Sequence, residues 1–165
     1  MSKIILGLGS NINNPLIQLQ NAVDYLKQHF FILKVSSIYI SQSLLKDEQP
    51  DYYNIILFCS SDKTPLEILQ IAKDIENQMG RIKIKEWGER VIDIDIIDYN
   101  NSIYDYDNLN IPHKQMKYRS FVLKPLMEIM PDYIHPQTKQ TVMGMYESLD
   151  DDFNIKILEG TSINI

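Results

Sequence analysis

The sequence predicts an α+β fold in which helices pack on one antiparallel sheet. Segments with the period of a strand alternate with segments of helical period, but some strand segments also follow one another directly. Consecutive strands favour an antiparallel sheet over a doubly wound parallel one. We expect a single domain over residues 1–165, because a chain of this length buries about 70% of its unfolded surface and needs no disulfide or metal ion to be stable.

The first part of the chain predicts two strands separated by a helix. Residues 3–8 are apolar and run into a glycine turn, which is typical of a short buried strand. Asn14 is expected to cap a helix whose first residue is Pro15, a position where the missing N–H costs nothing. An apolar stripe extends this helix to about residue 28. Residues 32–41 predict the second strand.

The middle of the chain predicts a polar loop, a strand and a clearly marked helix. The loop covers residues 42–51, and the strand over 52–60 is apolar apart from Asn54. This amide either bonds to neighbouring backbone or reads the edge of a flat heterocycle, and the sequence leaves both interpretations open. The run TPLE at 64–67 forms a capping box with proline at the first helical position. Gly80 ends that helix.

The last part of the chain is less regular. A turn is expected at 100–102, after which 103–106 could pair back on the preceding strand. A helix over 120–130 contains Pro125, which leaves open whether the helix is continuous or broken. A last helix is expected over 141–149 and a final strand over 155–158.

Composition excludes several classes of protein. The chain has 16 basic and 22 acidic side chains and a net charge of −6, which argues against a general nucleic-acid binder. Cys59 is the only cysteine and lies in an apolar run, so no disulfide is possible and a buried thiol is expected. No stretch is typical of a signal peptide or of a membrane span. We expect a cytoplasmic monomer without nucleic-acid or membrane partners.

The strand over 92–98 carries the sharpest chemical signal. Its period of two places isoleucines on one face and Asp93 and Asp95 on the other. Alternate residues of a strand lie roughly 6.5–7 Å apart. Two carboxylates at this spacing can share a pair of cations about 3.5–4 Å apart. An edge strand with a solvated acidic face would show the same pattern, so these two residues alone do not distinguish a metal site from an ordinary exposed strand.

Basic residues beside the aspartates favour phosphate chemistry. Arg81, Lys83, Lys85 and Arg90 precede the strand, as a site needs if it holds metal on one side and a polyphosphate on the other. The sequence has no Gly-x-x-x-x-Gly-Lys-Ser/Thr motif, so the chain is not a P-loop kinase. Taken together, the carboxylates and the cations predict ATP chemistry with magnesium.

Several motifs in order resemble one known family. They are GSN at 9–11, QPDYYN at 49–54, WG at 87–88, RVIDIDII at 90–97, IPH at 111–113 and MKYRSF at 116–121. Together they resemble 6-hydroxymethyl-7,8-dihydropterin pyrophosphokinase of folate biosynthesis, from about residue 4 to about residue 148. The resemblance implies a ferredoxin-like α+β fold and an ATP-dependent diphosphotransferase. That enzyme transfers the β,γ-pyrophosphoryl group of ATP to the hydroxymethyl oxygen of the dihydropterin and releases AMP.

The resemblance also implies roles for individual residues. Asp93 and Asp95 would hold two Mg²⁺ ions, and with Arg81 and Arg90 they would form the catalytic set. ATP would be contacted by Trp87, Arg90, Ile96, His113, Lys117 and Arg119. The pterin would be contacted by Ser41, Leu44, Tyr52, Asn54, Asp93 and Phe121.

This chain departs from the family pattern mainly before the aspartate strand. Glu86 and Glu89 stand where a basic residue and a proline are usual, and the loop before Trp87 is one residue short. We expect the added acidity to slow closure of that loop. Two alternatives remain: a non-catalytic module that binds pterin or nucleotide, and a two-metal nucleotidyltransferase that releases pyrophosphate instead of AMP.

Overall fold

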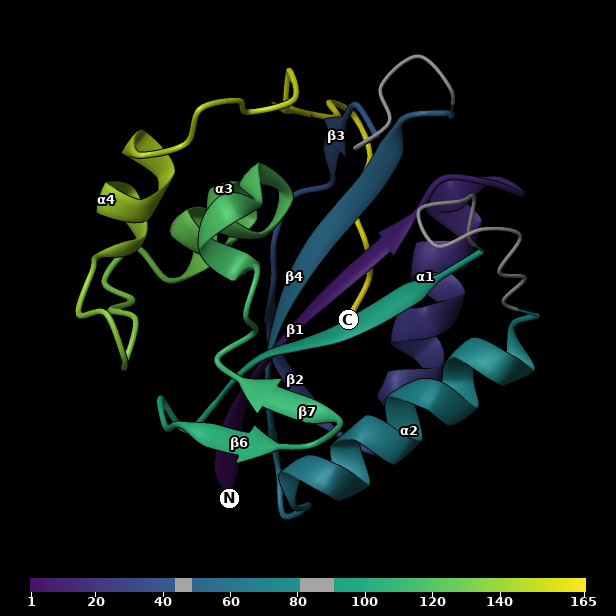
Figure 1. Ribbon diagram of the computed structural model, residues 1–165. Helices are drawn as coiled ribbons and strands as arrows, with labels where there is room; N and C mark the ends of the chain where they lie inside the picture. The colour runs from purple at the N-terminus through teal and green to yellow at the C-terminus, as the bar shows by residue number, and fades with distance from the viewer. Residues whose placement is uncertain (44–48, 81–90) are drawn as a thin grey trace.

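The structure is a computed structural model that describes residues 1–43, 49–80 and 91–165. One antiparallel sheet has the strand order β5-β1-β4-β3-β8, and β2 also pairs with β4 (Figure 1). Its strands are β1 (Ser2–Ser10), β2 (Phe31–Val35), β3 (Tyr39–Ser41), β4 (Tyr52–Ser61), β5 (Asp93–Tyr99) and β8 (Lys156–Ile157). The helices are α1 (Pro15–Leu26), α2 (Pro65–Gln78), α3 (Ser120–Ile129) and α4 (Val142–Glu147), with a 3-10 turn, η2, at Met116–Tyr118.

Helices cover both faces of this sheet. Helices α1 and α2 pack on one face through a large apolar cluster, and α3 and α4 pack on the other through a second cluster (Figure 1). Ile92, Ile94 and Ile96 belong to the first cluster, whereas Ile97 belongs to the second. The predicted α+β class with helices on an antiparallel sheet is therefore confirmed. We call the two sides the α2 face and the α3 face.

The beginning of α1 differs from the prediction. The helix starts at Pro15, but Asn14 has a left-handed backbone and makes no side-chain cap bond. A capping side chain needs an extended backbone to reach back over the first turn, so the conformation of Asn14 removes the expected contact. Helix α2 instead has the complete predicted box, in which the Glu67 N–H donates to Thr64 Oγ1 and Thr64 N–H donates to Glu67.

The segment predicted as one strand over 32–41 consists of two strands. Strands β2 and β3 both pair with β4 and are separated at Ser36. Ser36 still bonds across to Ile56, because its N–H donates to the Ile56 carbonyl and its hydroxyl accepts from the Ile56 N–H. The hydroxyl replaces a backbone carbonyl at the break, so the local polar groups stay satisfied.

A β-bulge interrupts β5 near its end. Ile96 pairs with Leu6 and Asp98 pairs with Ile5, so Ile97 is the extra residue. The bulge places Asp98 on the same face as Ile5 and Ile97, although a strict period of two would put it on the α2 face with Ile96. The aspartates of β5 therefore all lie on the α3 face.

The C-terminal half shows two further differences. Residues Tyr104–Tyr106 form β6, which pairs with β7 (Leu109–Ile111) in a separate hairpin rather than back on the preceding strand. Helix α3 is continuous through the buried Pro125, because only one helical bond is lost and the apolar stripe packs into the second cluster. In the described ranges, no helix combines the length and apolar character needed to cross a membrane.

Candidate functional site

A row of paired residues crosses the sheet on the α3 face. Gly9 on β1 pairs with Asp93 on β5 and with Asn54 on β4, and Asn54 pairs in turn with Tyr39 on β3. Directly paired residues project to the same face. Since neighbouring strands are about 4.8 Å apart, the backbones of Asp93 and Asn54 are separated by about 10 Å. Gly9 has no side chain, so only a glycine stands between the carboxylate of Asp93 and the amide of Asn54 on this face.

Gly9 is required by the position of Asn54. A Cβ atom at residue 9 would lie 2.5 Å from Asn54 Nδ2, closer than real carbon atoms approach. The amide therefore leans over the glycine, and Asn54 Nδ2 donates a long bond of 3.4 Å to the Leu8 carbonyl. Sequence inspection left open whether Asn54 bonds to backbone, and the structure contains this bond, although it uses only one end of the amide.

The other end of the amide lacks a partner. Asn54 Oδ1 is buried without a hydrogen-bond partner in the described structure, and so is Ser41 Oγ. Ser41 pairs with Tyr52 across β3 and β4, two residues along from Asn54. Buried polar atoms are rarely left unpaired unless a ligand or water completes them. These atoms fit the polar edge of a flat heterocycle.

Two basic side chains from a later segment of the chain meet at Asp95. Arg119 Nη1 lies 3.6 Å from Asp95 Oδ2, and His113 Nε2 lies 3.9 Å from the same oxygen. Asp95 is 41% exposed, whereas His113 and Arg119 are 23% and 18% exposed. The carboxylate is therefore open to a ligand, while the two basic groups are held against the protein. The Arg119 guanidinium also lies 5.5 Å from the centre of the Phe121 ring.

His113 is oriented by its own backbone. It follows a cis peptide bond between Ile111 and Pro112, and its N–H donates to the Ile97 carbonyl on β5. Its ring Nδ1 accepts from the Gln115 N–H at 3.1 Å, so the neutral ring carries its proton on Nε2, facing Asp95. Burial lowers the pKa of His113, the Asp95 charge opposes this, and Arg119 adds to the lowering. The ring is thus a neutral donor at physiological pH.

Sequence inspection missed one supporting residue. Glu76 on α2 is buried, and its Oε2 accepts from the Ile94 N–H at 2.9 Å. The bond ties α2 to the strand between Asp93 and Asp95, on the face away from them. The sequence did contain an indication of this role. Glu76 continues the helical spacing of the buried Ile68 and Ala72, so an acidic residue stands on the apolar stripe of the helix.

The remaining predicted residues fall into three groups. Tyr52 and Phe121 are half-buried on the α3 side, and Lys117 Nζ lies 5.3 Å from the Tyr118 ring centre. Ile96 is buried in the cluster on the α2 face, opposite to Asp95. The other predicted residues lie outside the described residues, namely Leu44, Arg81, Trp87 and Arg90.

The donor set fits magnesium bound together with a phosphate. Within residues 1–43, 49–80 and 91–165, no three His, Cys, Asp or Glu side chains gather closely enough to hold a metal ion alone. Asp93 and Asp95 supply two carboxylates on one face. Mg²⁺ is commonly held by one or two carboxylates plus substrate phosphates, so this arrangement matches a metal that arrives with a nucleotide.

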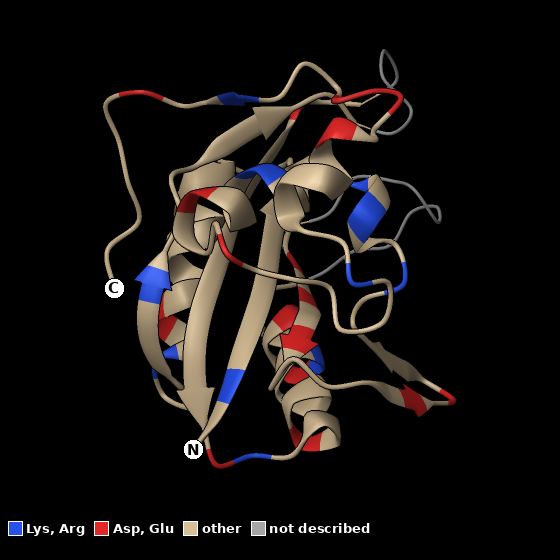
Figure 2. Ribbon diagram, turned by 90° about the vertical axis from the view of Figure 1, so that its left-hand side faces the viewer, with Lys and Arg blue, Asp and Glu red and all other residues tan. Residues whose placement is uncertain are grey.

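In the described part of the chain, Lys and Arg lie on several separate elements in the ribbon view of Figure 2. This dispersal agrees with the net charge of −6 and with an anion site that is local.

Comparison with known proteins identifies the family. The family model of 7,8-dihydro-6-hydroxymethylpterin-pyrophosphokinase (HPPK) matches residues 5–131. A pyrophosphokinase of Haemophilus influenzae, 2-amino-4-hydroxy-6-hydroxymethyldihydropteridine pyrophosphokinase, is 36% identical over 154 residues, covering 92% of this chain and 96% of that protein. Folic acid synthesis protein FOL1 of Dictyostelium discoideum is 40% identical over 152 residues, which cover 92% of this chain but 23% of FOL1.

Solved structures support the fold. A triple mutant of HPPK-DHPS from Plasmodium falciparum superposes with a TM-score of 0.74 at 18% identity, covering 88% of this chain and 44% of that chain. At this identity the likeness bears on the fold alone. The family match over most of the chain and the identity to the Haemophilus influenzae protein are decisive for membership. The chain belongs to the 7,8-dihydro-6-hydroxymethylpterin-pyrophosphokinase family.

Proposed function

We propose that this chain transfers the β,γ-pyrophosphoryl group of ATP to the hydroxymethyl oxygen of 6-hydroxymethyl-7,8-dihydropterin, giving AMP and the pterin diphosphate. Family membership supports this reaction. One observation in the molecule carries it: the row Asp93–Gly9–Asn54 places a carboxylate and an unpaired amide oxygen on the same face of the sheet, with only a glycine between them. A flat polar substrate seated there has its reactive end at the aspartates.

The pterin is oriented by the unpaired atoms at one end of the row. Asn54 Oδ1 accepts from the N–H edge of the ring, and Ser41 Oγ contributes a second hydrogen bond. Tyr52 and Phe121 bracket the ring, and Leu44 completes the pocket. A planar heterocycle needs few polar contacts when aromatic side chains fix its plane. This orientation directs the hydroxymethyl group toward Asp93.

The triphosphate is bound at the other end of the site. Asp93 and Asp95 would hold two Mg²⁺ ions, which would neutralise the charge of the phosphates. His113 donates from Nε2 to a phosphate oxygen, and Arg119 adds a fixed positive charge next to Asp95. Neither group has to reorganise as charge moves, because both are held by backbone or by packing.

We assign roles to the remaining residues that the family resemblance implied. Arg81 and Arg90 contact phosphates, Trp87 covers the substrates, and Lys117 and Ile96 contact ATP. Pyrophosphoryl transfer depends mainly on positioning and on cations that follow the moving charge, so these roles need no covalent chemistry. We also propose that the chain acts as a cytoplasmic monomer, because all the residues assigned to both substrates come from one chain. Light scattering in solution tests the monomer.

Product analysis tests the reaction. The protein is mixed with ATP, Mg²⁺ and 6-hydroxymethyl-7,8-dihydropterin, and an Asp95→Ala variant is run beside it. AMP and a pterin diphosphate in equal amounts, both lost in the variant, are the expected result. Release of pyrophosphate with AMP attached to the acceptor would instead identify a nucleotidyltransferase. Pterin binding without any nucleotide product would identify a binding module.

A further inference from the structure

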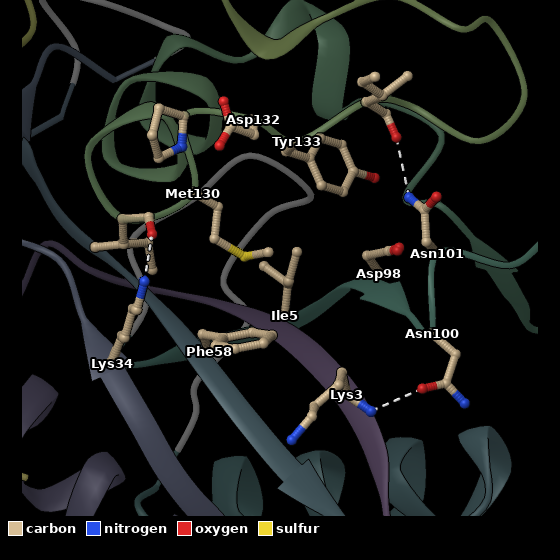
Figure 3. A pocket seen from close by; sticks show the side chains of 13 residues that line it. Lys3, Ile5, Lys34, Phe58, Asp98, Asn100, Asn101, Met130, Asp132 and Tyr133 are labelled. Carbon is tan, nitrogen blue, oxygen red and sulfur yellow. Dashed lines mark hydrogen bonds between the residues drawn. The ribbon is translucent and has the colours of Figure 1, made fainter.

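A second cavity lies on the α3 face at the opposite end of the sheet from the Gly9 row. It has a volume of about 670 Å³, is open to solvent, and is lined by residues of β1, β4, β5, Lys34 on β2 and the segment that follows α3 (Figure 3). Small-molecule sites typically have volumes of about 300–1,000 Å³. None of the residues assigned to ATP or to the pterin lines it. Asp98 lies three residues beyond Asp95 on β5, roughly 10 Å along the strand.

The middle of this cavity is apolar. Ile5, Phe58 and Met130 face one another across it, and Ile129 adds to the same wall (Figure 3). Phe58 provides a flat surface on which a ring can lie. A ligand body that fits here is therefore flat and apolar.

Several polar groups around the cavity already have partners. Lys34 Nζ donates to the Ile129 carbonyl at 3.2 Å, and Asn101 Nδ2 donates to the Ile134 carbonyl at 2.9 Å. The Lys3 N–H donates to Asn100 Oδ1 at 2.7 Å. These three groups are therefore already used within the protein.

Asp98 differs from these groups. It is 2% exposed, and neither of its carboxylate oxygens has a hydrogen-bond partner of good geometry. The nearest donors, the Asn101 N–H and the Tyr133 hydroxyl, lower its pKa less than burial raises it, and the pKa is raised to about 7. No ion pair joins Asp98 to another residue in the described ranges. An uncompensated carboxylate at this depth is costly unless a partner is supplied.

The position of this carboxylate results from the β-bulge at Ile97. Without the bulge, Asp98 would project into the apolar cluster on the α2 face with Ile96. With it, the carboxyl group lies at one end of the cavity beside Tyr133 and Asn101 (Figure 3). Bulges often re-aim a side chain in this way next to functional sites. The apolar part of the cavity thus ends at a buried carboxylate whose nearest donors, the Asn101 N–H and the Tyr133 hydroxyl, do not reach good hydrogen-bond geometry.

We propose that this cavity binds a small molecule with a flat apolar body and an amidinium- or guanidinium-type edge, whose two N–H groups bond to the Asp98 carboxylate. Two parallel N–H bonds to one carboxylate are the strongest neutralising contact that a planar cation can make. The body of the ligand lies against Phe58 and Met130. The site is independent of the ATP and pterin positions, so it stands or falls separately from the proposed reaction.

Benzamidine is the probe, because it combines a ring with an amidinium group. Its binding is measured by calorimetry and by chemical shifts of amide groups in the intact protein. We expect saturable binding that weakens at least about tenfold in Asp98→Asn, since one N–H then meets an amide N–H₂ instead of an oxygen. Benzamide, which has the same shape without the charge, should bind at least about tenfold more weakly than benzamidine. Binding should persist with saturating ATP and Mg²⁺.

The pH dependence of benzamidine binding gives a second test. The charged and titratable groups around the cavity are Lys3, Lys34, Asp98, Asp132 and Tyr133. Burial and the neighbouring Asp98 charge raise the pKa of Tyr133, so it stays a neutral donor. A cation needs the ionised form of Asp98, so benzamidine affinity should rise about tenfold from about pH 6 to about pH 8, and this rise should vanish in Asp98→Asn.

Three results would overturn the proposal. They are absence of benzamidine binding, equal binding by wild type and a folded Asp98→Asn protein, and displacement of benzamidine by ATP or by the dihydropterin. Asp98→Asn removes a buried charge without changing side-chain volume, so loss of folding is not expected. A melting curve of the variant verifies this.

Discussion

Replacing Gly9 by alanine tests the central feature of the pterin site. The added Cβ would lie 2.5 Å from Asn54 Nδ2, and the backbone of Gly9 is not in the left-handed region, so the clash falls on the amide alone. The amide is held to the protein by one long bond to the Leu8 carbonyl, so it should swing away. The strand itself should tolerate alanine, which loses less entropy on folding than glycine.

The expected loss is in pterin affinity. Misplacing Asn54 removes one or two ligand hydrogen bonds and leaves polar groups unpaired, which costs about 1–3 kcal/mol, or roughly a 5–150-fold rise in Kd. ATP affinity should change by less than about twofold, because the aspartates and Arg119 are untouched. Calorimetry with each substrate separately measures both values. Thermal unfolding should shift by no more than a few degrees.

A matched control and a double mutant sharpen the test. Gly7→Ala places a Cβ 3.3 Å from Ile97 Cδ1 and 3.5 Å from Ile56 Cδ1, in the apolar cluster and not against Asn54, so it should leave pterin binding unchanged. In an Asn54→Ala background the Gly9→Ala change should add less than about 0.5 kcal/mol, because its target is gone. Wild-type pterin affinity in Gly9→Ala, or equal harm from Gly7→Ala, would refute the reasoning.

Three further outcomes follow from the same geometry. Asp95→Asn should lower kcat for AMP formation by about 10²–10³-fold with little change in pterin affinity, because a charge facing the phosphates is lost. Steady-state kinetics measures this, and an unchanged kcat would show that Asp95 is not part of the metal site. Glu76→Ala should destabilise the protein by about 1–3 kcal/mol in urea unfolding, because the Ile94 N–H loses its acceptor. Glu76→Gln keeps an acceptor oxygen and should destabilise the protein less. Equal losses of stability in the two variants would argue against this bond. The folded-state pKa of Asp98, about 7, lies above the ordinary aspartate value of 3.8. The folded protein therefore binds the proton more tightly, and stability from this group is lost as pH rises from about 4 through about 7. Asp98→Asn should therefore gain up to about 4 kcal/mol relative to wild type at about pH 8 and little at about pH 4, in urea titrations at both values; the same difference at both pH values would contradict this assignment.

Local patterns were enough to predict the elements and the aspartate strand. The capping box at Thr64 and Glu67 operates within one helical turn, and the period of two in β5 depends only on the pleat of a strand. Both could therefore be inferred from neighbouring residues. Asn14 shows the limit of this approach, because its residue type suits a cap but its backbone is left-handed. The split at Ser36 depends on pairing with the distant strand β4, so no local signal specified it. The hairpin of β6 and β7 pairs neighbouring segments, and the prediction missed it although its contacts are local.

Much of the candidate site could be inferred only through the family resemblance, and the tertiary structure decided how its residues meet. Gly9 gains its role from register, because β1 pairs it with Asp93 on one side and with Asn54 on the other. Arg119 reaches Asp95, which lies 24 positions earlier in the sequence, through the packing of α3. The bulge that turns Asp98 out of the α2-face cluster arises from pairing between β1 and β5. The sequence by itself determined which side chains could do this chemistry, whereas strand register and packing decided which of them face one another, because those depend on residues far apart in the chain.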